Sequence, residues 1–165
     1  AAEKISEICK NHGGLEPVVA ESANEQARIL NMRSNIYTAL KGQSYDILDV
    51  SVPPPRLAQV MDVIDRISEK YGIYTALYGH AGDGNLHPQL MLKEGVEPST
   101  YRNAEDEIYA AATQIGGAIT AEHGIGKIRA KYLHYYLSER QRDLMVGIRK
   151  VFDPRGILNP DIGFL

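Results

Sequence analysis

The sequence has few of the features that accompany disulfides, membrane insertion or nucleic-acid binding. Cys9 is the only cysteine, which excludes an internal disulfide and is typical of a reducing, cytoplasmic compartment. No apolar run approaches the roughly 18 residues of a membrane-spanning helix, and the N-terminus has no signal-peptide pattern. The formal net charge of −3 provides no basic surface for nucleic acid. We therefore expect a globular domain that neither spans a membrane nor binds nucleic acid.

The length and composition are those of one globular domain. A chain of 165 residues with 44% hydrophobic and 24% charged residues is large enough to bury its own core. We therefore expect a single domain over residues 1–165. The chain begins without methionine and inside a helical pattern, which suggests that it is part of a longer protein.

The periodicity of the apolar residues predicts an α+β fold. Strand-like alternation is present at 46–52, 73–79, 86–92 and 118–120, and helical spacing at 1–12, 22–42, 56–71, about 101–115 and from 138 onward. From residue 46 to 120 the order is βαββαβ, the ferredoxin-like order, which gives an antiparallel sheet with both helices on one face. The remaining helices flank this unit. Capping boxes at Ser22/Glu25 and Ser138/Gln141 mark two of the helix starts.

Two histidines flank a glycine-rich loop in the stretch "YGHAGDGNLHPQLM", residues 78–91. If the strands on either side pair as a hairpin, His80 and His87 can converge near its closed end. Two neutral imidazoles and a carboxylate are a common ligand set for a transition metal, and Glu122, after the last strand, is the candidate carboxylate. Surface histidines beside a turn are an equally good interpretation of the spacing alone.

His123 and Arg33 are each open to two interpretations. His123 precedes Gly124 and Gly126, and is either a general base beside a metal or a histidine in a turn. Arg33 falls on the apolar stripe of its helix. Its side chain either extends to the surface or faces a pocket, where a guanidinium could bind a substrate carboxylate through two hydrogen bonds.

Three motifs together resemble a known family. They are "GHAGDGNLHP", "GGAITAEHGIGKIRAKYL" and "FDPRGILNP", in this order. They are similar to the C-terminal domain of FAD-linked oxidases of the vanillyl-alcohol oxidase superfamily, of the D-lactate dehydrogenase, glycolate oxidase and D-2-hydroxyglutarate dehydrogenase type. The resemblance implies that this chain is the substrate-binding, C-terminal part of such an enzyme. It also implies FAD, held mainly by an N-terminal domain that is absent here, and a divalent metal, zinc, as cofactors.

The resemblance implies a role for four residues in the chemistry. His80, His87 and Glu122 match positions that hold the divalent metal in some members. His123 matches the base that takes the proton of the substrate hydroxyl while hydride leaves Cα for N5 of the flavin.

Three further residues match positions that bind substrate or cofactor. Arg33 matches a helix arginine that binds the substrate carboxylate. Gln89 stands where some members have an asparagine at the substrate. Asn159 falls in a tail that approaches the flavin in the family, although "NPDIG" here replaces the usual "NPGK".

The implied partners are a small 2-hydroxy acid and the FAD-binding domain of the same polypeptide. The electron acceptor is left open between a protein and a quinone, and the parent enzyme is expected in the cytoplasm or at the inner face of a membrane. An isolated chain is expected to expose apolar residues and to self-associate. Two other functions stay open: a ferredoxin-like regulatory module that binds a metal or ligand, and a small metallohydrolase.

Overall fold

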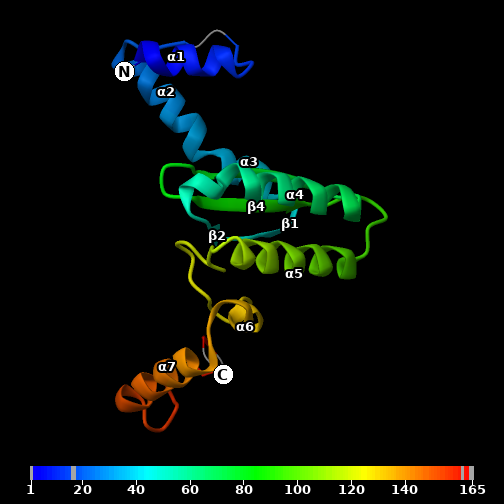
Figure 1. The fold of residues 1–165 in the computed structure, drawn as a ribbon, viewed down its shortest axis with the longest axis vertical. Coiled ribbons are helices and arrows are strands. Elements are labelled where there is room, and N and C mark those ends of the chain that lie inside the picture. The colour runs from blue at the N-terminus through cyan, green and yellow to red at the C-terminus, as the bar shows by residue number, and fades with distance from the viewer. Residues whose placement is uncertain (1, 16–17, 161, 164–165) are drawn as a thin grey trace. The chain divides into compact units, whose positions relative to one another are not determined.

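The chain divides into two compact units, Ala1–Gly42 and Gln43–Leu165. The computed structural model describes residues 2–15, 18–160 and 162–163 (Figure 1). The expectation of one domain over the whole chain stays a prediction. None of the helices in the described residues is long and apolar enough to cross a membrane.

The first unit contains three helices, α1 (Ala2–Asn11), α2 (Ala23–Ser34) and α3 (Ile36–Lys41). The capping box of Ser22 and Glu25 is present. The prediction of one helix over 22–42 is wrong, because the helix is interrupted at Asn35. The side chains of Ser34 and Asn35 each bond to a carbonyl four residues earlier, at 2.9 Å, and such bonds compete with the main-chain ladder.

The second unit is built on an antiparallel sheet with β4 (Asn85–Met91) at its centre. β3 (Tyr74–His80) pairs with one edge of β4, and β1 (Ser44–Ile47) and β2 (Val50–Ser51) pair with the other. Ala118 forms a single antiparallel bridge to Ser51, so only one residue of the predicted strand 118–120 pairs. The resulting order is the ferredoxin-like one, and the α+β prediction is confirmed.

The predicted strand 46–52 is split into β1 and β2 because Pro88 lies opposite the split. Ile47 pairs with Gln89 and Val50 with Leu86, so the register is unchanged across the gap. Leu48 donates its amide to the Pro88 carbonyl at 2.8 Å, but proline has no N–H to return the bond. The interruption is therefore a missing hydrogen bond and not a change in the path of the chain.

Two long helices cover the apolar face of this sheet. α4 (Leu57–Tyr71) and α5 (Pro98–Gln114) contact each other and the strands. Leu86 and Leu90 of β4 point into the core with them. His87 and Gln89 alternate with these leucines and therefore lie on the opposite face. Other core residues are Leu48, between β1 and β2, and Val50, Val60, Ile64, Tyr101 and Ile108 of the strands and helices.

The ends of the predicted elements differ in places from those of the structure. α5 begins at Pro98, earlier than predicted, with proline in the first turn, a position that needs no amide donor. After the bridge at Ala118 come a short 3-10 turn, Ala130–Tyr132, and the one-turn helix α6 (Leu133–Tyr136), neither of which was predicted. α7 (Glu139–Phe152) begins with the predicted capping box of Ser138 and Gln141.

Candidate functional site

The glycine-rich loop joins β3 and β4 as a hairpin. His80 lies opposite Asn85 and Tyr78 opposite His87, which brings the ring centroids of the two histidines to 5.9 Å. Gly84 has a left-handed φ of 77°, and a Cβ there would overlap the carbonyl oxygen of Val52. Only glycine therefore allows this turn to pack against Val52, directly after β2.

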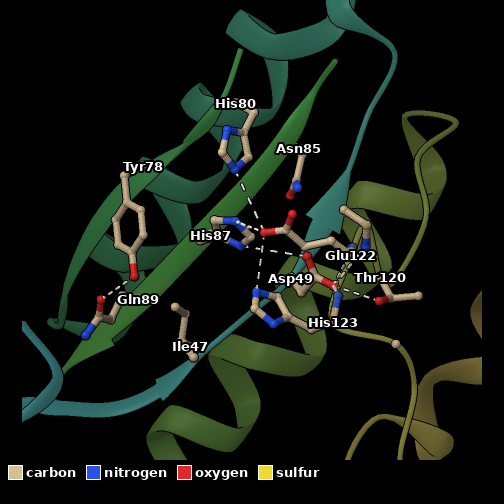
Figure 2. Close-up of polar contacts among 12 residues, drawn as sticks. Ile47, Asp49, Tyr78, His80, Asn85, His87, Gln89, Thr120, Glu122 and His123 are labelled. Carbon is tan, nitrogen blue, oxygen red and sulfur yellow. Dashed lines mark hydrogen bonds and ion pairs between the residues drawn. The ribbon is translucent and has the colours of Figure 1, made fainter. Parts of the chain in front are cut away.

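One carboxylate oxygen lies at the centre of three imidazoles (Figure 2). Oε1 of Glu122 is 3.0 Å from Nε2 of His87, 3.6 Å from Nε2 of His123 and 3.9 Å from Nε2 of His80. The ligand atoms of His80, His87 and Glu122 all lie within 4.8 Å of one another. His80, His87, Glu122 and His123 come from three separate segments of the sequence, and the structure brings them together. We call these four residues the histidine cluster.

The histidine cluster is closed on one side and open on the other. The side chain of His87 is only 6% exposed, whereas those of Glu122 and His123 are 49% exposed and that of His80 is 37% exposed. A cation held by these atoms would therefore be anchored by a buried ligand and reachable from solvent, which is the arrangement of a site that meets a small molecule.

Asp49 holds the segment that carries Glu122 and His123. Its Oδ2 accepts the hydroxyl of Thr120 at 2.6 Å and the amides of Ala121, Glu122 and His123 at 2.9, 3.2 and 2.9 Å. Burial is the largest influence on the Asp49 pKa and raises it, but the four hydrogen bonds together outweigh burial and lower the pKa. Asp49 is therefore an ionised carboxylate with no exposed surface.

The other oxygen of Asp49 faces His87. Oδ1 lies 3.7 Å from Nδ1 of His87, and neither atom has a hydrogen-bond partner among the described residues. Asp49, His87 and His123 also form a second group whose ligand atoms could reach one metal ion. His87 is common to both groups, and its two ring nitrogens face different carboxylates.

Gln89 follows His87 on the same face of β4 and is fully buried. Its Oε1 accepts a hydrogen bond from the hydroxyl of Tyr78 at 2.8 Å, which fixes the orientation of the amide. Its Nε2 has no partner among the described residues, so the side chain retains a buried donor that a ligand could satisfy.

Two of the predicted site residues belong to other segments of the sequence. Arg33 is an exposed residue of α2 in the first unit, and its position beside the histidine cluster stays a prediction. Asn159 lies in the segment after α7, with a left-handed φ of 44°. Its carbonyl accepts a hydrogen bond from Arg149 at 3.1 Å, and its predicted contact with a flavin also stays a prediction.

Asp49 and Arg129 were not predicted from the sequence. The signal for Asp49 was a charged residue inside a predicted strand, on the face that alternates with Leu48 and Val50. Arg129 donates to the carbonyl of Ile47 at 3.1 Å and to the hydroxyl of Tyr109 at 3.0 Å. It thereby ties the glycine-rich segment after His123 to β1 and α5, and no local pattern marks it.

Comparison with known proteins identifies the family. The chain is 36% identical over 159 residues to a D-lactate dehydrogenase of Archaeoglobus fulgidus, which covers 96% of this chain and 35% of that protein. It is 36% identical over 162 residues to glycolate oxidase subunit GlcD of Bacillus subtilis, covering 96% and 34%. It is 31% identical over 146 residues to a probable mitochondrial D-2-hydroxyglutarate dehydrogenase of Oryza sativa, covering 87% and 25%.

The chain thus spans between a quarter and about a third of the length of these relatives. The family of FAD linked oxidases, C-terminal domain, matches residues 1–162, which is nearly the whole chain and includes the histidine cluster. The chain therefore belongs to the C-terminal domain family of FAD-linked oxidases.

Proposed function

We propose that this chain is the substrate-binding domain of an FAD-dependent 2-hydroxy acid dehydrogenase of the D-lactate or glycolate type. The observation that carries the proposal is the convergence of three imidazoles on one oxygen of Glu122. The names of the relatives, which include D-lactate dehydrogenase and glycolate oxidase, support the choice of a small hydroxy acid as substrate.

His80, His87 and Glu122 would hold a divalent metal, and their donor atoms suit zinc. The fit rests on the donors themselves, because two imidazole nitrogens and a carboxylate oxygen lie within 4.8 Å of one another. Bound there, the metal would polarise the substrate hydroxyl and so favour loss of its proton.

His123 would take the proton of the substrate hydroxyl. Its Nε2 lies 3.6 Å from Oε1 of Glu122 and its ring is half exposed, so it adjoins the proposed metal ligands and can be reached by a substrate. Histidine is the side chain most often used for such a transfer near neutral pH. FAD supplies the acceptor for the hydride from the substrate Cα, which no amino-acid side chain provides.

Gln89 and Arg33 would bind the substrate, and Asn159 would lie near the flavin. The free Nε2 of Gln89 is a donor on the same face as His87, suited to an oxygen of the acid. A guanidinium at Arg33 suits the carboxylate, which it can bind through two parallel hydrogen bonds.

The proposed protein partner is an FAD-binding domain in the same polypeptide, with a protein or a quinone accepting electrons from the flavin. Apolar residues of α7 support packing against another domain or another copy of the chain, since Val151 and Phe152 are 77% and 79% exposed. The parent enzyme is proposed to act in the cytoplasm or at the inner face of a membrane.

The proposal is tested by flavin reduction in an enzyme that contains this chain together with its FAD-binding part. Anaerobic mixing with D-lactate, glycolate or D-2-hydroxyglutarate is expected to bleach the flavin. His123→Asn should slow bleaching by about 10²- to 10⁴-fold, the usual contribution of a general base. His134→Asn is the control, because His134 is an exposed ring bonded only locally, to the carbonyl of Lys131.

Unchanged bleaching in His123→Asn would contradict the role of this histidine. Absence of bleaching with every 2-hydroxy acid, together with hydrolysis of an ester or phosphate, would favour the metallohydrolase instead. Binding of metal with neither activity would favour the regulatory module.

A further inference from the structure

Asp49 and His87 lie opposite each other on adjacent segments of the sheet. Ile47 pairs with Gln89 and Val50 with Leu86, so residue 49 lies directly opposite residue 87. The neighbouring pair, Leu48 and Pro88, shares the hydrogen bond, which makes Asp49 and His87 a non-hydrogen-bonded pair. In such a pair the two side chains stand on the same face and at the closer of the two spacings found in antiparallel sheets.

The two facing atoms, Oδ1 of Asp49 and Nδ1 of His87, are both buried and both lack a partner among the described residues. They are 3.7 Å apart, longer than a hydrogen bond. A buried polar atom without a partner is unfavourable, and a small rotation of the imidazole would satisfy both atoms at once. Asp49 cannot rotate in the same way, because its Oδ2 is held by four donors.

We propose that Asp49 is a positioning residue that accepts the Nδ1–H of His87 and so presents Nε2, without a proton, to the metal. The proposal rests on the metal site of the proposed function. A metal-binding histidine commonly donates its other N–H to a carboxylate or carbonyl, which fixes both the tautomer and the ring orientation. Through Oδ2, the same carboxylate orders the backbone of the segment that carries Glu122 and His123.

The second possible ligand group, Asp49, His87 and His123, is the competing arrangement. It would use Nδ1 of His87 and leave Nε2 to Glu122 alone. Asp49 has no exposed surface, whereas Glu122 and His80 are partly exposed, so only the group with Glu122 and His80 combines a buried ligand with two ligands that a substrate can approach. The two arrangements differ in which nitrogen of His87 binds the metal.

Nitrogen NMR of the unaltered chain loaded with zinc distinguishes them. Ring ¹⁵N shifts are expected to show the metal on Nε2 of His87 and a proton on Nδ1, with slow exchange because the ring is buried. Metal on Nδ1, or a rapidly exchanging Nδ1 proton, would overturn the proposal. This measurement needs no variant, so it holds even if a substitution at Asp49 prevents folding.

The Asp49→Asn substitution tests the same proposal through metal affinity. The asparagine oxygen can still accept from Thr120 and the three amides, but its NH₂ group then faces Nδ1 of His87. The amide NH₂ can only donate, so Nδ1 must accept its hydrogen bond without a proton; the ring proton then lies on Nε2, where it opposes metal binding. Zinc affinity, measured by competition with a chelator, is expected to fall about 10- to 100-fold.

Asp153→Asn is the control. Asp153 is another buried aspartate that accepts backbone amides, from Ile157 at 3.0 Å and Leu158 at 2.8 Å, but no histidine faces it in the described contacts. We expect Asp153→Asn to lose about as much stability as Asp49→Asn but to keep the zinc affinity of the unaltered chain. Equal zinc affinities for Asp49→Asn and the unaltered chain would overturn the positioning role.

His87→Ala separates this inference from the proposed function. If His87→Ala lowers zinc affinity and Asp49→Asn does not, the metal site stands and only the positioning role is wrong. If His87→Ala leaves zinc affinity unchanged, the metal site itself is wrong.

Discussion

Glu105, on the buried side of α5, makes the stability of the second unit depend on pH. Burial is the largest cause that raises its pKa, to about 7 from an ordinary 4.5, and the charge of Asp46 adds to it while Lys131 opposes. The side chain is 7% exposed. In the unfolded chain the carboxyl loses its proton near pH 4.5, whereas in the folded protein it keeps the proton to about pH 7. Between these values folding becomes less favourable as pH rises.

The cost above pH 7 follows from the two pKa values. A difference between about 7 and 4.5, at about 1.36 kcal/mol per pH unit, corresponds to about 3 kcal/mol. Glu105→Gln removes the ionisation and keeps the shape of the side chain. It is therefore expected to raise the free energy of unfolding by up to about 3 kcal/mol above pH 7, and by little near pH 4.5.

Urea unfolding of the parent and the Glu105→Gln protein, above pH 7 and near pH 4.5, measures this difference in the free energy of unfolding. Glu107→Gln on the same helix is the control of opposite sign, because hydrogen bonds from Lys70 and then Tyr71 lower the Glu107 pKa. Its charge is stabilising above the unfolded pKa, so the Glu107→Gln substitution should destabilise at neutral pH. A Glu105→Gln protein that is equally or less stable than the parent above pH 7 would refute the reasoning.

Three other predictions concern the hairpin, the substrate and the cofactor. Gly84→Ala should lower the free energy of unfolding by more than the roughly 1–2 kcal/mol of a left-handed alanine, because the new Cβ meets the Val52 carbonyl; Gly82→Ala, which meets nothing within 4 Å, should have little effect in the same urea titration. Arg33→Lys in the complete enzyme should raise KM for the acid, because the lysine ammonium is a point charge and cannot form the two parallel hydrogen bonds of a guanidinium. Unchanged kinetics would argue against binding of the substrate carboxylate by Arg33. The chain purified alone should bind no FAD, and a flavin absorption band near unit stoichiometry would contradict this.

The sequence was sufficient to predict the elements that have strong periodicity. The stripe of α4 and the alternation around the glycine loop predicted a helix and a hairpin, both of which are present. The hairpin in turn predicted that His80 and His87 converge. Glu122 and His123 come from a loop with weak local patterning. Their proximity to His80 and His87 was predicted from the βαββαβ order and from the family motifs.

Long-range contacts account for what could not be predicted from the sequence. The role of Asp49 could be recognised only in the structure, where β1 and β2 pair with β4. Its hydrogen-bond partners are 71 to 74 residues further along the chain. The split between the two strands depends on Pro88, which lies on a different strand. The break at Asn35 is local, but it depends on side-chain hydrogen bonds that compete with a helix-favouring stripe, and periodicity does not weigh these against each other.

Binding of one divalent metal by the histidine cluster can be measured by a cobalt titration of this chain. Cobalt(II) substitutes for zinc at nitrogen and oxygen ligands and absorbs visible light when bound in such a site. We expect the absorption to saturate at one equivalent, and we expect Glu122→Ala to weaken binding while Glu139→Ala, at the exposed start of α7, does not. Absence of saturation at one equivalent, or equal binding by the Glu122→Ala protein and the unaltered chain, would contradict a metal site at the histidine cluster.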